Sequence, residues 1–87
     1  MNEQILKDKR GIRYGKISAE SNGNSIIYDK LNNRLGTIKV DSSSHYIAYD
    51  KMNRKLATYD IRLDVTKDTM GRKIGKGNML LNFFFPQ

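Results

Sequence analysis

Short runs of alternating apolar and polar residues, separated by turn-forming residues, occupy most of the chain. Alternation with a period of two is typical of half-buried strands. An apolar residue recurs three positions before, and another six positions after, each of four aspartates: Ile5, Ile26, Ile47 and Val65 before, and Tyr14, Leu35, Leu56 and Ile74 after. We expect these residues to point from the two arms of each hairpin into a core. The pattern predicts an all-β fold of eight short antiparallel strands in a meander or hairpin stack, without an amphipathic helix.

The four aspartates begin a repeated segment. Each is followed by Gly or Asn three residues later, by a base five residues later and by a small residue seven residues later. The four copies are Asp8 to Gly15, Asp29 to Gly36, Asp50 to Ala57 and Asp68 to Gly75, and their starts lie 21, 21 and 18 residues apart. We interpret the chain as a single domain, residues 1–87, with repeat turns near 8–15, 29–36, 50–57 and 68–75.

The repeat has the chemistry of a tight hairpin loop. An aspartate at the start of a turn accepts hydrogen bonds from backbone amides two or three residues on. Gly and Asn enter the left-handed region of backbone conformation at the least cost. Together these positions predict a type I turn closed by a left-handed residue in a G1 bulge. The small residue that ends each copy predicts that another backbone or a large side chain approaches closely there, and we expect it on the face opposite to the apolar residue before it.

The segments between the copies predict the remaining turns and strands. Residues 21–25 and 41–44 are rich in Ser, Asn, Asp and Gly and are expected to form turns. Between the third and fourth copies, apolar residues at 59, 61, 63 and 65 alternate with charged ones, which predicts a half-buried strand.

Two parts of the repeat carry a resemblance to a known family. They are the middle copies, with Tyr28-Asp29, Arg34-Leu35-Gly36 and Tyr49-Asp50, and the fourth copy, from Asp68 to Asn78. It resembles small bacterial proteins built of tyrosine-aspartate/glycine-arginine β-hairpin repeats, over roughly residues 5–78. The resemblance implies meandering or stacked hairpins and no common activity, because these proteins are largely uncharacterised. Lys7 and Lys67 stand where the pattern has tyrosine, and Ala57 where it has glycine, so the outer copies are expected to cap the array.

The C-terminal segment, residues 79–87, is the most apolar part of the chain. Such a segment must be covered to avoid aggregation. We expect it either to plug the open end of the hairpin array or to dock on a second copy in a homodimer, with a partner protein as a third option. The candidate contact residues are Leu80, Leu81, Phe83, Phe84 and Phe85.

Composition excludes many kinds of chemistry. The 87 residues hold no cysteine and one histidine, which leaves no disulfide, no thiolate or histidine metal cluster and no expected cofactor. Charged residues near the N-terminus and the lack of a long apolar run predict a cytoplasmic protein without a membrane partner. No enzyme is expected: the four aspartates occupy turns, His45 beside residues 42–44 lacks a third orienting group, and residues 75–77 lack the phosphate-loop spacing.

The charge suggests a binding role. The net charge is +7, from 16 bases and 9 acids. In stacked hairpins the recurring base would form a column, which predicts an anion-binding ladder. Its candidate residues are Arg13, Arg34, Lys55 and Lys73, with Arg54 and Arg72 beside them. The alternative is that each base pairs with its own turn aspartate and only keeps the surface soluble.

Two tyrosines extend this hypothesis. Tyr28 and Tyr49 precede turn aspartates and would stack bases beside the lysines; alternatively they cap the core. We therefore expect a non-enzymatic module whose basic edge contacts a polyanion, either nucleic acid or an acidic protein surface. The alternative is a protein-interaction or assembly module, such as one encoded by a phage or another mobile element, acting through the apolar tail and the sheet face.

Overall fold

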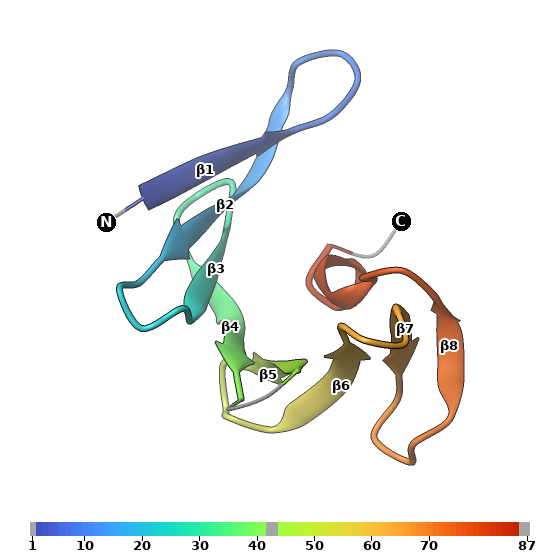
Figure 1. Ribbon diagram of the computed structural model, residues 1–87. Coiled ribbons are helices and arrows are strands. Elements are labelled where there is room, and N and C mark those ends of the chain that lie inside the picture. The colour runs from blue at the N-terminus through green and yellow to red at the C-terminus, as the bar shows by residue number, and fades with distance from the viewer. Residues whose placement is uncertain (1, 42–43, 86–87) are drawn as a thin grey trace.

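The computed structural model describes residues 2–41 and 44–85, and it confirms the all-β meander. Eight antiparallel strands form one sheet in chain order, and a short 3₁₀ helix follows (Figure 1). The elements are β1 (Asn2–Lys7), β2 (Arg13–Ala19), β3 (Ser25–Asp29), β4 (Arg34–Val40), β5 (His45–Asp50), β6 (Lys55–Asp60), β7 (Val65–Lys67), β8 (Lys73–Lys76) and η1 (Leu80–Phe83). The sheet curls around η1, which lies on its concave side.

The four hairpin turns have the geometry that the repeat predicts. In the first, the Gly11 amide donates to the Asp8 carbonyl at 3.0 Å and the Asp8 amide donates to the Ile12 carbonyl at 2.9 Å. The closing residues have positive φ: Gly11 82°, Asn32 65°, Asn53 65° and Gly71 82°. In every turn the aspartate Oδ1 accepts the amides two and four residues on. The G1-bulge turn is therefore confirmed, with the second side-chain bond one residue later than expected.

A second irregularity follows each turn. Lys7 pairs with Arg13, but Leu6 pairs with Gly15, so Tyr14 between them is an extra residue in the second strand. The same shift recurs in the other three hairpins. In a bulge of this kind, two consecutive side chains turn toward the same face of the sheet. Tyr14 lies 5.1 Å from the Phe85 ring, and a Cβ on Gly15 would meet that same ring. The expectation that these two neighbours lie on opposite faces is wrong.

The core-facing position before each aspartate also differs from the prediction. The side chains two residues before the aspartate point inward, namely Leu6, Ile27, Ala48 and Thr66. Their neighbours one residue earlier point outward, and Ile5 is 42% exposed. The prediction that Ile5, Ile26, Ile47 and Val65 face the core is wrong. The turn and the bulge that follows it both lie between the two strands of a hairpin. The alternation in one strand therefore does not show which residues of the other strand point inward. We call the face of Ile27 the inner face and the opposite one the outer face.

The segment predicted as one strand over residues 59–65 is interrupted. Strand β6 ends at Asp60, a turn spans residues 61–64, and Ile61 and Leu63 are exposed. The Asp60 Oδ1 accepts the amides of the second and third residues after it at 3.0 and 3.1 Å, and Asp64 has a φ of 56°. This side-chain chemistry stabilises a turn in place of an extended backbone. The turn expected over residues 21–25 is present before β3, whereas that at 41–44 includes residues 42 and 43, which lie outside the described ranges.

The apolar tail fills the inner face. Leu80 is fully buried and belongs to one cluster with Ile27, Ala48, Ala57 and Phe84. A Cβ built on Gly36 would meet the Phe84 ring, and one built on Gly75 would meet the Met79 sulfur, each at 2.6 Å. The close approach predicted at the small repeat position is confirmed at Gly36 and Gly75, as it is at Gly15. The tail lies within the curl of its own chain (Figure 1).

The turn aspartates predict how stability depends on pH. The pKa values of Asp29, Asp50 and Asp68 lie below the usual 3.8, mainly because each carboxylate accepts the amide four residues on. A carboxyl whose pKa is lower when folded stabilises the fold above pH 3.8 and loses that effect as the pH falls. We expect urea midpoints to drop between pH 6 and pH 3. Changing all three residues to Asn keeps the acceptor oxygen but removes the titration, so the drop should shrink. An unchanged drop would contradict this explanation.

The tail predicts a sharp contrast between adjacent phenylalanines. Phe84 is 9% exposed and Phe83 is 38% exposed. Replacing a buried Phe by Ala costs about 3–5 kcal/mol, because the apolar contact is lost and a cavity remains. We expect Phe84→Ala to approach global unfolding and Phe84→Leu to lower the urea midpoint measurably. Phe83→Ala is the matched control and should cost far less. Equal losses from Phe83→Ala and Phe84→Ala would mean that the tail is not packed as described.

Candidate anion-binding face

The outer face carries the whole charge excess of the chain. Strand pairing and alternation place nine bases there: Lys7, Arg13, Lys16, Arg34, Lys39, Lys55, Lys67, Lys73 and Lys76. The acids at outward strand positions are Glu3 and Asp60. This leaves seven bases and seven acids for the rest of the sequence, so the turns and links are neutral as a group. The net charge of +7 therefore resides on one side of the sheet.

The recurring base stands directly opposite the residue before each turn aspartate. The cross-strand pairs are Lys7 with Arg13, Tyr28 with Arg34, Tyr49 with Lys55, and Lys67 with Lys73. Successive pairs are staggered, because Tyr28, Tyr49 and Lys67 lie opposite residues that come three positions after the recurring base of the preceding hairpin, namely Lys16, Thr37 and Thr58. The four pairs therefore form a diagonal column across the outer face. The predicted bases Arg13, Arg34, Lys55 and Lys73 are thus brought to one face.

The turn aspartates do not neutralise this column. The Nε atoms of Arg54 and Arg72 each lie 3.0 Å from the carboxylate of their own turn aspartate, and both side chains are 78% exposed. In these two hairpins the base that pairs with the turn aspartate is therefore the arginine just before the recurring base, and not the recurring base itself. Within the described ranges, Arg34, Lys55 and Lys73 form no ion pair. Arg13 donates from Nη2 to the Asn32 Oδ1 at 2.9 Å, which links the first turn to the second.

Each tyrosine of the column lies beside a lysine from the preceding hairpin or strand. The Lys16 ammonium is 4.8 Å from the centre of the Tyr28 ring, and the Lys39 ammonium is 5.1 Å from that of Tyr49. Lys16 also lies 3.3 Å from a Glu3 carboxylate oxygen. A cation over a ring is favourable, but it covers one ring face that a nucleobase would use. Base stacking by Tyr28 and Tyr49 stays a prediction.

Sequence reasoning missed part of the face. Lys16, Lys39 and Lys76 were not among the candidate residues. The available signal was strand alternation, but Lys16, Lys39 and Lys76 stand an odd number of residues after the recurring base of their strand. They share its face only because the bulge inserts an extra residue between them. The alternation identifies the outward residues of a strand only when the position of its bulge is known.

The predicted tail contacts are mostly occupied within the chain. Leu80 and Phe84 are buried, Leu81 and Phe85 are half-buried against the core, and Phe83 is exposed. The tail thus covers the inner face of its own sheet, whereas a plug at the open end of the hairpin array stays a prediction. A homodimer contact through these residues stays a prediction, and Phe83 is the member with the most surface to offer.

Two other features are absent from residues 2–41 and 44–85. No group of three or more His, Asp or Glu side chains is placed to hold a metal ion in this part of the chain. The same residues include no helix with the length and apolar character needed to cross a membrane.

The chain was also compared with known proteins. Comparison with models of protein families, with curated proteins and with solved structures finds no significant match.

Proposed function

We propose that this protein is a non-enzymatic binding module whose outer face holds a polyanion, with nucleic acid as the favoured partner. The observation that carries the proposal is the placement of the entire net charge on the outer strand positions, while the rest of the chain is neutral. Charge that served solubility alone would have no reason to collect on one face.

The arrangement has an energetic cost that a polyanion would remove. Lys7 faces Arg13, and Lys67 faces Lys73, across adjacent strands. Like charges directly opposite each other in a sheet are destabilising. Adjacent strands lie about 4.8 Å apart, so the two charges of each of these pairs lie within one Debye length, about 8–10 Å in physiological salt. A chain of phosphates would replace this mutual repulsion with attraction and release its condensed counterions.

Nucleic acid is favoured over an acidic protein for a chemical reason. The column alternates bases with two tyrosines, Tyr28 and Tyr49. Cationic side chains that follow a backbone, interleaved with aromatic rings, are the features of single-strand binding surfaces. An acidic protein surface is the alternative partner, and a cytoplasmic location belongs to the same proposal.

The test is the salt dependence of binding to single-stranded DNA. The strand should exceed the roughly 4–16 nucleotides that a small binding fold covers. We expect affinity to fall steeply with salt, since each base in contact with a phosphate contributes about 0.7 to the slope of log K against log salt. Changing Lys7, Arg34, Lys73 and Lys76 to Gln should reduce that slope by about 2–3. These four exposed side chains form no ion pair among the described residues, so the variant should fold.

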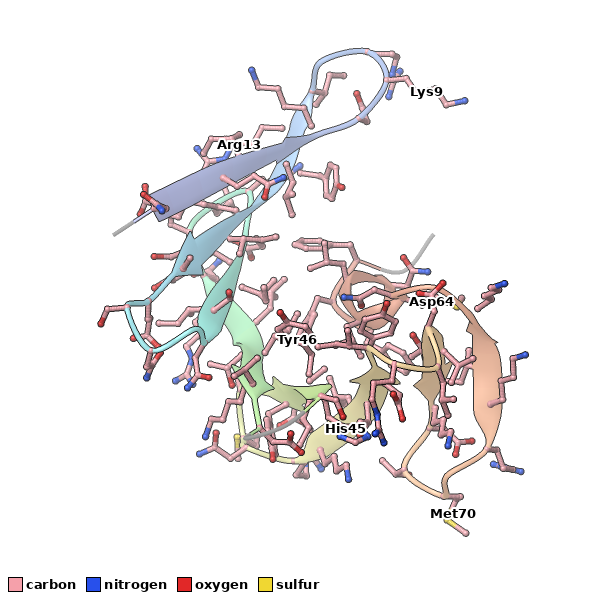
Figure 2. All side chains as sticks on the ribbon, in the orientation of Figure 1. Lys9, Arg13, His45, Tyr46, Asp64 and Met70 are labelled. Carbon is pink, nitrogen blue, oxygen red and sulfur yellow. The ribbon has the colours of Figure 1, made fainter. Side chains whose placement is uncertain are left out.

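A matched variant controls for net charge. Changing Lys9, Arg10, Lys30 and Lys51 to Gln removes the same charge from the turn tips; Lys9 is labelled at the first tip in Figure 2. Its slope should stay close to that of the unmodified protein. Equal loss in the two variants would show that net charge alone drives binding, and no measurable binding by the unmodified protein would refute the proposal.

A further inference from the structure

The outer face has a cavity between the last two hairpins. This cavity of about 210 Å³ lies between β5–β6 and the β7–β8 turn. It is lined by His45, Lys55, Thr58, Asp60, Lys67, Asp68, Thr69 and Gly71. Figure 2 shows His45 on the opposite side of β5 from Tyr46, which faces η1. The cavity is thus part of the basic face and separate from the core.

Both carboxylates that line the cavity are already engaged. Asp68 accepts two turn amides through Oδ1, and its Oδ2 lies 3.0 Å from the Arg72 Nε. Asp60 accepts two amides through Oδ1, and its Oδ2 lies 3.3 Å from the His45 Nε2. These bonds lower the pKa of both carboxyls, the first cause in each case being a backbone amide. Each carboxylate therefore has partners for both of its oxygens, which reduces its competition for the cavity's lysines.

Three further polar side chains at the cavity are donors that have no partner among the described residues. Within the described part of the chain, Lys55 and Lys67 form no ion pair, and the hydroxyl of Thr58 forms no hydrogen bond. Thr58 pairs directly with Lys67 across β6 and β7, and Lys55 precedes it by three residues on β6. Two ammonium groups and a hydroxyl thus border one small cavity. Donors of this kind are complementary to an oxyanion.

We propose that this cavity holds one phosphate group, bound by Lys55 and Lys67 and by a hydrogen bond donated from the Thr58 hydroxyl. The inference rests on the proposed function and gives it an anchoring point, the place where one phosphate of the strand is held in a fixed position. A phosphate offers more acceptor oxygens than a carboxylate, so it satisfies three separated donors better than an acidic side chain would. The volume is below the roughly 300–1,000 Å³ of pockets for drug-sized ligands, as befits a single small group.

The test uses sulfate as the probe, because it is tetrahedral and keeps its double charge near neutral pH. Sulfate is titrated into the full chain at constant ionic strength while backbone amide NMR signals are followed. We expect saturable shifts at Thr58, Lys67 and Gly71. Thr58→Val preserves shape, charge and strand preference, and should weaken sulfate binding about tenfold or more through loss of a charge-assisted hydrogen bond. The double change Lys55→Gln and Lys67→Gln should abolish the saturable shifts.

The chain offers a matched control at Thr37, which occupies the same repeat position in the preceding hairpin, eight residues after its turn aspartate. Thr37 is an outward threonine outside the cavity, and its hydroxyl has no hydrogen-bond partner among the described residues. Thr37→Val should leave the sulfate titration unchanged. Equal effects of Thr37→Val and Thr58→Val, or shifts that grow linearly without saturation, would overturn the phosphate site.

Single-stranded DNA separates this inference from the proposed function. Displacement of sulfate by DNA, with weaker DNA binding by Thr58→Val, supports both. Salt-dependent DNA binding that Thr58→Val leaves unchanged overturns the cavity site and leaves the basic face standing. Saturable sulfate binding without any DNA binding supports the cavity site, assigns it to a free small phosphate and refutes the proposed function. If polyglutamate displaces sulfate and DNA does not, the cavity binds a carboxylate in preference to a phosphate, and the proposed phosphate site is wrong.

Discussion

The packing of the apolar tail against small residues on the inner face is the interaction on which the rest of the structure depends. An 87-residue chain with no disulfide must bury a sufficient core from few side chains. The residues of the tail contribute to that core, and they meet the four hairpins in reverse chain order. Met79 meets Gly75, Leu80 is buried with Ala57, Phe84 meets Gly36 and Phe85 meets Gly15. One element thus contacts all four hairpins and fixes the curl of the sheet.

The same constraint determines what the outer face is free to become. Because the bulge after each turn directs two consecutive residues inward, every hairpin contributes its apolar and small residues to the tail. The remaining positions face outward and need only tolerate water. They hold nine bases and few acids, whereas the turns are occupied by their own aspartates and arginines. Core formation and the proposed anion binding therefore use opposite sides of the same strands and do not compete for residues.

The sequence predicts well what depends on neighbours in the chain. The four G1-bulge turns follow from Asp8 and Gly11 and their counterparts, because the relevant hydrogen bonds lie within five residues. The face of Ile5 was predicted wrongly because a bulge leaves no mark in an alternating pattern. The alternating pattern does not indicate the turn at residues 61–64. Asp60 fits that pattern as a polar strand residue, although its carboxylate accepts hydrogen bonds from the turn. The packing position of Phe84 and the cavity beside Thr58 depend on contacts between segments far apart in the chain, which a single sequence does not specify.

The most direct test of the account is a double-mutant cycle between Gly15 and Phe85. The nearest atoms to a Cβ at Gly15 belong to the Phe85 ring, followed by the Tyr28 carbonyl oxygen at 2.9 Å. If the ring occupies that space, Gly15→Ala should destabilise the unmodified protein more than it destabilises the Phe85→Ala variant. Residues in such contact give coupling energies of about 0.5–3 kcal/mol in urea unfolding. Additive losses, within about 0.3 kcal/mol, would contradict the claim that the tail rests on the small residues of the sheet.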